Sequence, residues 1–203
     1  MAVSLLGVLL TGVWAWLAGA LFGATYALWL VAKDDVPKHI ENWRTGAEGE
    51  RMTEKELRPL ANEGWYVAHD LEGRFGNVDH VVIGPAGVFI LDSKRWGGSV
   101  TVQDGVPTVT PVDNPDAAWS KPRLAGKMRG LCAANSEAVR SLAKIKRWIQ
   151  PVVVLWSPFE AGVVESAGVY FIHGDHLADW LRSRPSQFTP DEQRQLASAF
   201  GVG

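Results

Sequence analysis

The sequence predicts an α/β domain that follows a single N-terminal transmembrane helix. Two observations support this fold class. All 42 charged residues of the 203-residue chain lie beyond residue 32, so the first 32 residues carry no charged side chain. Beyond residue 44, helical and β-rich patterns follow one another in the order helix, strands, long helix, strands, helices, which indicates an α/β domain.

The first 32 residues are expected to cross a bilayer once. A helix that rises about 1.5 Å per residue would reach roughly 48 Å here, more than the roughly 30 Å hydrocarbon core, whereas two crossings need about 40 apolar residues. Lys33, Lys38 and Arg44 follow the segment, and basic residues flank membrane helices on the cytoplasmic side. We therefore expect a single-pass membrane protein whose C-terminal domain lies in the cytoplasm.

Composition limits what the rest of the chain can be. The net charge is −2, 47% of the residues are hydrophobic, and Cys132 is the only cysteine. An internal disulfide framework and a cysteine-based zinc site are therefore excluded, and disorder is not expected. The roughly 170 residues after the first segment suffice for one domain with a hydrophobic core. We expect a juxtamembrane linker over residues 33–44 and one domain over residues 45–203.

Local patterns predict the elements of this domain. Thr45 and Glu48 have the T-x-x-E spacing of a capping box, which predicts a helix over about 46–61. Asp104 and Gly105 form a strong hairpin-turn signal. Further patterns predict strands at 65–69, 78–83, 88–94, 99–103, 106–112, 151–156 and 169–172, and helices at 124–149, 175–182 and 190–200.

The strands at 78–83 and 88–94 are expected to form a hairpin. Between them lies Gly84-Pro85-Ala86-Gly87, in which the proline in second place and the glycine in fourth place fit a type I turn. If Gly84 faces Gly87, the register places Asp79 opposite Asp92. Directly opposed side chains share one face of a sheet with their Cβ atoms about 5 Å apart.

This register gathers charges at one end of the hairpin. Lys94 shares the face of Asp92, because side chains alternate along a strand, whereas Ser93 and His80 point to the other face. Two opposed carboxylates are destabilising unless a positive charge lies between them. The pattern therefore indicates either a site for a hard cation with oxygen ligands or a plain cross-strand salt-bridge cluster at a sheet edge.

A third carboxylate is expected to reach the same place from the first helix of the domain. Leu57, Leu60 and Ala61 are predicted to form its buried stripe, and Glu50 lies seven residues before Leu57. Seven residues are nearly two helical turns, so Glu50 should lie on the inward face.

Several short motifs follow one another in this part of the chain. They are Gly46-Ala47-Glu48-Gly49-Glu50, Gly76-Asn77-Val78-Asp79-His80, Gly84-Pro85-Ala86-Gly87-Val88, Asp92-Ser93-Lys94 and Gly97-Gly98. Together they resemble the nuclease-related domain (NERD), a branch of the PD-(D/E)XK nuclease superfamily. The resemblance covers about residues 44–156 and implies a restriction-endonuclease-like αβββαβ core with a mixed sheet.

The resemblance also implies roles for individual residues. Glu50 matches the helix glutamate, Asp79 matches the first metal-binding aspartate, and Asp92 with Lys94 matches the (D/E)XK pair. Mg²⁺ or Mn²⁺ would be held by Asp79, Asp92, Glu50 and the backbone carbonyl of Ser93. NERD sequences often have glutamate where this chain has Asp92, a difference that bears on metal geometry and rate more than on mechanism.

Such a site is suited to phosphodiester hydrolysis. A Mg²⁺ ion held by two carboxylates supplies a nucleophilic water and stabilises charge on the phosphate. Lys94 would orient the attacking water or neutralise the phosphoryl oxygens. Glu50, Asp79, Asp92 and Lys94 are therefore the predicted catalytic set.

Basic residues concentrate between residues 121 and 147, where Glu137 is the only acidic residue. Such a cluster is typical of a surface that binds the nucleic-acid backbone, although a solvated helix face or contact with anionic lipid would also explain it. The predicted nucleic-acid-binding residues are Lys121, Arg123, Lys127, Arg129, Arg140, Lys144, Lys146 and Arg147.

The leading hypothesis is a membrane-anchored, metal-dependent nuclease that acts on DNA. One alternative is a non-catalytic module of the same fold that binds nucleic acid or a protein partner at the membrane. Another is a scaffold whose basic surface faces anionic lipid. Metal binding and turnover separate the first hypothesis from the second, because a binding module does not need Lys94.

Overall fold

The structure is a computed structural model, and the compact unit Arg44–Gly203 contains the α/β domain. The unit places helices on both sides of a β-sheet, and it is described here by itself. The residues that the structure describes are 14, 16, 20–26, 38–71 and 77–202.

The transmembrane segment expected over residues 1–32 lies mostly outside the described residues, and so do residues 33–37 of the expected linker. Residues 20–26 are described and are helical. In the part of the chain that the structure describes, no helix is both long and apolar enough to cross a membrane.

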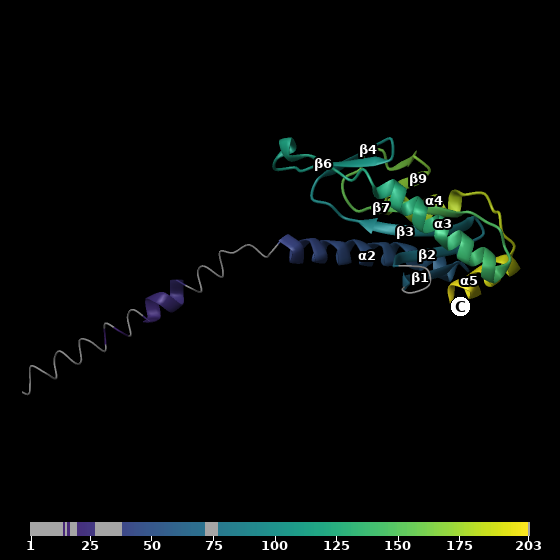
Figure 1. Cartoon of the computed structure of the whole chain (residues 1–203), viewed down its shortest axis with the longest axis horizontal. Coiled ribbons are helices and arrows are strands. Elements are labelled where there is room, and N and C mark those ends of the chain that lie inside the picture. The colour runs from purple at the N-terminus through teal and green to yellow at the C-terminus, as the bar shows by residue number, and fades with distance from the viewer. Residues whose placement is uncertain (1–13, 15, 17–19, 27–37, 72–76, 203) are drawn as a thin grey trace, which may run out of the picture. The chain divides into compact units, whose positions relative to one another are not determined.

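The elements follow the predicted order closely (Figure 1). The long helix ends at Ala143, earlier than expected, and the strand at Val163–Ser166 has no counterpart among the predicted elements. In chain order the elements are α2 (Lys38–Asn62), β1 (Tyr66–Leu71), β2 (Val78–Gly84), β3 (Gly87–Lys94), β4 (Ser99–Gln103), β5 (Val106–Thr110), η1 (Pro115–Ala117), β6 (Trp119–Ser120), α3 (Leu124–Ala143), β7 (Ile149–Leu155), β8 (Val163–Ser166), β9 (Val169–His173), η2 (Gly174–His176), α4 (Leu177–Ser183) and α5 (Pro190–Phe200).

The central sheet has the strand order β1-β2-β3-β7-β9-β8. The pairs β1–β2, β2–β3 and β8–β9 are antiparallel, whereas β3–β7 and β7–β9 are parallel. The long helix α3 lies between β3 and β7 in the chain, as a parallel crossover requires. The prediction of an α/β fold with a mixed sheet is therefore confirmed.

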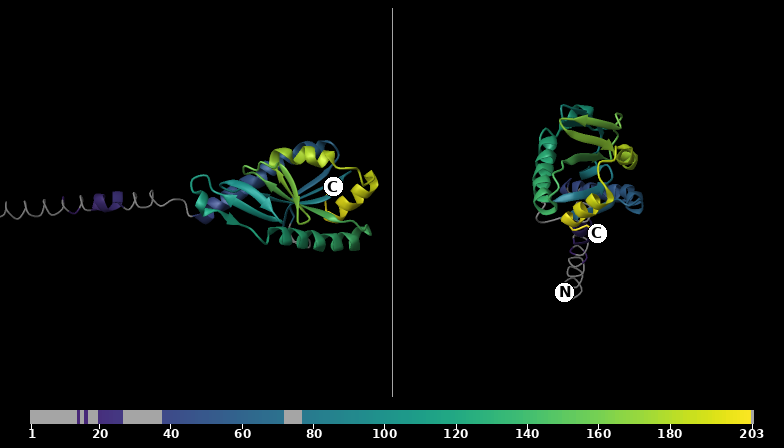
Figure 2. Two further views of the ribbon diagram at one scale, coloured as in Figure 1. Left: turned by 90° about the horizontal axis from the view of Figure 1, so that it is seen from above. Right: turned by 90° about the vertical axis from the view of Figure 1, so that its right-hand side faces the viewer.

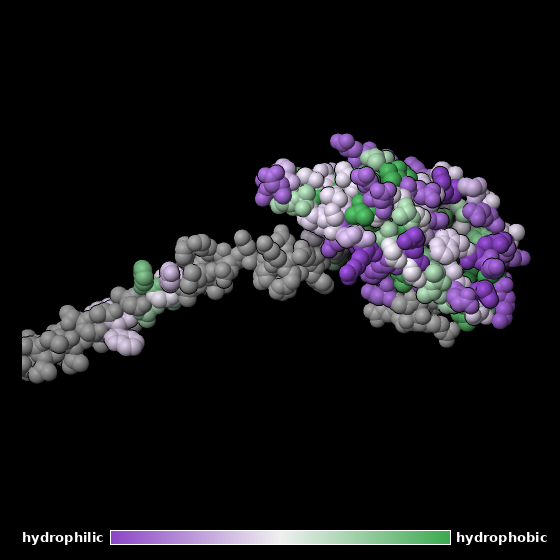
Figure 3. Space-filling view, turned by 45° about the horizontal axis from the view of Figure 1, so that its top comes forward, coloured by the Kyte–Doolittle hydropathy of each residue, from purple (hydrophilic) through white to green (hydrophobic). Residues whose placement is uncertain are grey.

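Two hydrophobic cores lie on opposite faces of this sheet, because successive strand residues point to opposite sides. On one face, Leu57 and Leu60 of α2 and Leu177 of α4 pack with Val82 and Leu91. The alternate strand residues pack against α3 and α5 on the other face. Figure 2 shows the sheet between these two helix layers. The outer surface seen in Figure 3 is mainly hydrophilic with small hydrophobic patches.

Helix α2 differs from the prediction at both ends. It begins at Lys38, within the expected linker, so Thr45 lies inside the helix and the capping box predicted at Thr45 and Glu48 is wrong. Glu48 instead pairs with Arg95, whose Nη1 donates to the Glu48 carboxylate over 2.5 Å. Ala61, which was expected to be buried, is exposed.

A smaller antiparallel sheet of β4, β5 and β6 extends beyond the central sheet (Figure 1). Asp104 and Gly105, which form the tight turn between β4 and β5, both have positive φ, as predicted for this hairpin signal. Val100 and Val109 join the core beneath α3. Trp119 lies in β6 of the small sheet, and its ring contacts the ring of Trp96, two residues beyond the end of β3. The small sheet thereby positions the segment that leads into α3 near the end of β3.

Candidate active site

The β2–β3 hairpin has the register that the sequence predicts. Val81 pairs with Ile90, and His80 pairs with Leu91. Asp79 and Asp92 are the next residues toward the open end. By strand alternation their side chains share the face of Val81 and Ile90, which pack beneath α3.

The two carboxylates interact electrostatically. Burial raises the pKa of Asp79 above its ordinary value, and the neighbouring Asp92 carboxylate raises that pKa further. Lys94, the backbone N–H of Ser93 and Lys127 act in the opposite direction. The Ser93 N–H donates to Asp79 Oδ2 over 3.2 Å. The pair predicted from the register is therefore close enough for like charges to matter.

Lys94 lies within this acidic cluster. Its Nζ is 2.7 Å from Asp92 Oδ2 and donates to the carbonyl oxygen of Ser93 over 3.1 Å. Apart from this ion pair, the buried Asp92 Oδ2 accepts no hydrogen bond from the described residues. The Lys94 ammonium thus contacts Asp92 Oδ2 and the Ser93 carbonyl oxygen, two atoms that the resemblance assigns to metal binding.

Glu50 approaches from α2 and is half-buried. Burial raises the pKa of Glu50, and Asp79 is the next cause, whereas Lys94 lowers it. The Glu50 carboxylate therefore interacts electrostatically with Asp79 and Lys94 at the end of the hairpin. No group of three or more His, Cys, Asp or Glu side chains in the described part of the chain is arranged so that it could hold a metal ion.

The donor set nevertheless fits a hard cation such as Mg²⁺. Two carboxylates repel each other at this end of the sheet, and the only partner of the buried Asp92 Oδ2 among the described residues is the Lys94 ammonium. Mg²⁺ is commonly held by one or two carboxylates and retains several waters, so a third carboxylate in direct contact is not required.

A chain of hydrogen bonds lies on the opposite face of β3, buried at Thr53, Ser93 and His80 and reaching the surface at His69. Trp156 Nε1 donates to Thr53 Oγ1 over 2.8 Å, and Thr53 Oγ1 lies 2.7 Å from Ser93 Oγ. Ser93 Oγ lies 3.1 Å from His80 Nε2, and His80 Nδ1 lies 2.8 Å from His69 Nδ1. The chain fixes Ser93 from behind while its backbone contacts Asp79 and Lys94.

His80 belongs to this chain and lies away from the acidic face, as predicted. Its side chain is 1% exposed, and burial, with His69 nearby, lowers the pKa of His80 to about 3. The neutral ring is therefore a structural group. Sequence reasoning missed Thr53, although the i, i+4 spacing of Gly49, Thr53 and Leu57 places all three on one helix face.

A pocket of about 650 Å³ opens beside Lys94. Three of the predicted nucleic-acid-binding residues, Lys121, Arg123 and Lys127, reach it from the start of α3 and the segment before it. The described residues that line it are Lys94, Trp96, Lys121, Pro122, Arg123, Leu124 and Lys127. We call this space the Lys94 pocket.

The other predicted basic residues lie elsewhere. Lys127 and Arg129 are two residues apart, so their side chains leave α3 about 200° apart around its axis. Arg129 lies against Gly168 in the turn between β8 and β9. Lys144 ends α3 in a left-handed conformation with a φ of 60°. The basic residues that lie close together in the sequence are therefore separated on the surface of the folded domain.

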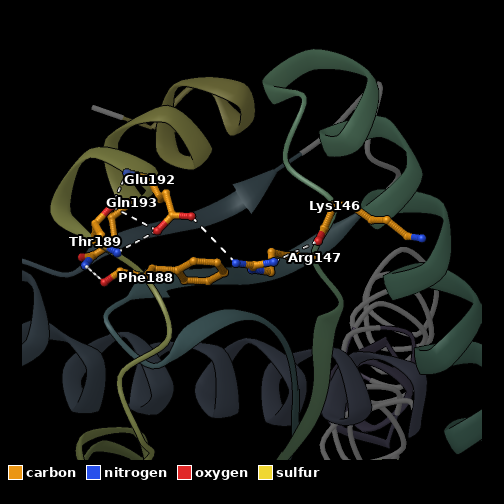
Figure 4. A network of polar contacts seen from close by, with 6 residues as sticks. All are labelled: Lys146, Arg147, Phe188, Thr189, Glu192 and Gln193. Carbon is orange, nitrogen blue, oxygen red and sulfur yellow. Dashed lines mark hydrogen bonds and ion pairs between the residues drawn. The ribbon is translucent and has the colours of Figure 1, made fainter.

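The remaining basic residues gather near the C-terminal end of α3. Arg140 and Lys146 line a separate pocket with Trp148, and Arg140 pairs with Glu137 over 3.5 Å. Arg147 reaches toward α5 (Figure 4), where its Nη2 is 3.8 Å from Glu192 Oε1 and its guanidinium lies over the Phe188 ring. These contacts give Arg147 a structural role between β7 and α5.

Comparisons with known proteins show which family the chain resembles. Residues 45–156 match the model of a family described as the nuclease-related domain. The chain is also 32% identical over 68 residues to an uncharacterized protein of Bacillus anthracis. That match covers 31% of this chain and 32% of the relative, so the chain spans about a third of the relative's length. No solved structure matches the chain significantly.

Proposed function

Because the chain belongs to the nuclease-related domain family, we propose that it is a metal-dependent nuclease that hydrolyses phosphodiester bonds in DNA. The observation that carries this proposal is the meeting of Asp79, Asp92 and Lys94 at one end of the sheet, beside a pocket with three further cations. The order α2, β1–β3, α3 and β7 supports a restriction-endonuclease-like αβββαβ core.

Asp79 and Asp92 would hold Mg²⁺ or Mn²⁺, with Glu50 and the Ser93 carbonyl as further oxygen ligands. When bound, this metal supplies Lewis-acid activation of water and charge stabilisation at the phosphate. The Ser93 N–H orients Asp79 for this task through its hydrogen bond to Oδ2.

Lys94 and Glu50 would act on the reacting groups. Lys94 stands between Asp92 and the Ser93 carbonyl, where its ammonium would neutralise charge that develops on the phosphoryl oxygens. A raised pKa at Glu50 makes its carboxylate a better proton acceptor, so Glu50 would position the attacking water or take its proton. Lys121, Arg123 and Lys127 would bind the adjacent phosphates.

We also propose that residues 1–32 anchor the enzyme in a membrane, with the domain in the cytoplasm. The support is the charge-free sequence of the segment and the basic residues that follow it. Membrane fractionation of cells that express the full chain tests this proposal. The domain should remain with membranes in high salt and should be released when residues 1–32 are deleted.

The alternative is a non-catalytic module that binds nucleic acid or a protein partner. It is favoured by the Asp92–Lys94 ion pair and by the lack of a ready three-group metal site among the described residues. The full chain, purified in detergent, should be incubated with linear, circular and single-stranded DNA and with RNA, in Mg²⁺, Mn²⁺ or EDTA. Metal-dependent cutting that Lys94→Ala abolishes supports the nuclease. Retention of DNA without cutting supports the binding module.

A further inference from the structure

The Lys94 pocket points to a substrate class. We propose that it holds one unpaired nucleotide of the strand being cut, with the base against Trp96 and a phosphate on Lys121, Arg123 and Lys127. This inference rests on the proposed nuclease function, which leaves open the form of nucleic acid that enters the site. It predicts a preference for single strands or unpaired ends.

The size of the pocket suits a nucleotide. Its volume of about 650 Å³ lies within the roughly 300–1,000 Å³ that small-ligand pockets span. A single unstacked nucleotide is a ligand of this order of size, whereas a nucleotide within a duplex would have to leave its stack to enter. Enzymes that need a nucleotide inside a pocket take it from single strands or extrude it from the helix.

Trp96 provides a fixed aromatic wall two residues beyond Lys94. Its backbone N–H donates to Ser157 Oγ over 2.7 Å, and its carbonyl accepts from the same hydroxyl over 2.9 Å. Ser157 is itself 2% exposed. The Trp96 ring meets Trp119 edge to face with 5.5 Å between ring centroids. Aromatic side chains held in this way are typical stacking partners of unpaired bases.

The charges around the wall suit a phosphate. The pocket lining in the described residues contains four cations and no carboxylate. Lys121 Nζ is held 5.2 Å from the centroid of the Trp119 ring. Lys94 lines the pocket and its Nζ lies 2.7 Å from Asp92 Oδ2. The pocket therefore adjoins the acidic pair, and its nucleotide would lie next to the bond that is cut.

The far end of α3 offers an internal control. The pocket there also combines a tryptophan with basic residues, since Trp148 lies beside Arg140, Lys146 and Arg147. Trp148 is 54% exposed, but both arginines beside it pair with glutamates, Arg140 with Glu137 and Arg147 with Glu192. Substitution of Trp148 therefore measures how much a surface tryptophan among basic residues contributes to nucleic-acid binding when it is remote from Lys94.

The experiment measures dissociation constants by fluorescence anisotropy, with the full chain in detergent and in EDTA so that no strand is cut. The probes are a labelled single-stranded oligonucleotide and the corresponding blunt duplex. The wild type should prefer the single strand. Because stacking of one base on an aromatic ring changes affinity substantially, Trp96→Leu should weaken single-strand binding by roughly 10-fold and reduce the preference. Trp148→Leu should leave both dissociation constants unchanged.

Lys121→Gln provides a second variant that leaves the core intact, and it should also weaken binding of the single strand. Equal affinity for both probes, or equal effects of Trp96→Leu and Trp148→Leu, overturns the inference, and so does a lack of binding by the wild type. Competition by anionic vesicles as strong as by the oligonucleotide also overturns it. Selective binding without later cutting in Mg²⁺ would contradict the nuclease proposal alone.

Discussion

Asp79 illustrates how a proposed metal-binding side chain lowers stability. In the folded state the neighbouring Asp92 and burial favour the protonated form of Asp79, so its pKa is raised. The folded protein then binds this proton more readily than the unfolded chain does. The free energy of unfolding should therefore fall as pH rises from the ordinary carboxyl pKa through the raised one.

Replacing this carboxylate removes the repulsion. In EDTA at neutral pH, Asp79→Asn should increase the free energy of unfolding by about 1 kcal/mol, or roughly 2–4 °C in Tm for a chain of this size. Mg²⁺ should raise the Tm of the wild type and not that of the variant. Thermal unfolding with and without Mg²⁺ checks both effects, with the exposed Asp113→Asn as control. A variant with a lower Tm than the wild type, or a wild-type Tm that Mg²⁺ does not change, would contradict this interpretation.

Thr53 is the central residue of the chain behind β3. Its hydroxyl contacts the Gly49 carbonyl, Ser93 Oγ and Trp156 Nε1. Thr53→Val keeps the shape but leaves the indole N–H without a partner, which should cost about 1–3 kcal/mol. Catalytic activity should fall as well, because Ser93 loses its support. Thr53→Ser should restore both properties in urea unfolding and cleavage assays, and equal losses in the two variants would exclude this role.

At the scale of elements, glycine at the end of β2 permits a close packing contact. A Cβ at Gly84 would overlap the ring of Trp65, which is buried beside α2. Gly84→Ala should therefore lower the free energy of unfolding by roughly 1–3 kcal/mol. Gly130→Ala on α3 meets nothing within 4 Å and should be neutral or stabilising by up to about 1 kcal/mol. Urea unfolding compares the two, and similar losses would be inconsistent with the packing argument.

The division of the basic residues by α3 has a consequence for binding. Lys121→Ala or Lys127→Ala should weaken DNA binding and lower the slope of log affinity against log salt by about 1 each, because one phosphate contact is lost. Arg140→Ala should change the slope less, since Arg140 lies at the other pocket and pairs with Glu137. Anisotropy at several salt concentrations measures the slopes, and a larger effect at Arg140 would refute the division.

The sequence predicts local elements well where one pattern dominates. The register of the β2–β3 hairpin follows from its turn, and α5 spans Pro190–Phe200, the range predicted for it. The sequence failed where tertiary contacts decide the outcome. Glu48 pairs with Arg95 instead of capping a helix. Strand β8 is only four residues long and gains its stability by pairing with β9.

The candidate site shows the same limit. Alternation along two strands was enough to bring Asp79, Asp92 and Lys94 together. Helical spacing places Thr53 on the inward face of α2, but it does not identify Trp156, the residue after β7, as the partner of Thr53, because the two meet only in the folded domain. Spacing along a sequence also does not tell on which flank of α3 a basic side chain lies.

At the scale of the whole molecule, a charge-free N-terminal segment precedes a nuclease-related domain. The domain places an acidic pair, one lysine and a basic pocket at the same end of its central sheet. If the anchor and the nuclease function are as proposed, the domain reaches only nucleic acid that comes to the membrane surface. Substrate access is then controlled by location as well as by the pocket.

We propose that the Asp92 carboxylate serves metal-dependent hydrolysis. This role is tested by the initial rate of oligonucleotide cleavage by the wild type, Asp92→Asn and Asp92→Glu across a Mg²⁺ titration. Asp92→Asn should lose about 100-fold or more in rate, because it removes a charge that holds the metal. Asp92→Glu should remain active with a shifted Mg²⁺ dependence. Cleavage by Asp92→Asn at the wild-type rate, or no cleavage by any of the three proteins, would contradict the claim.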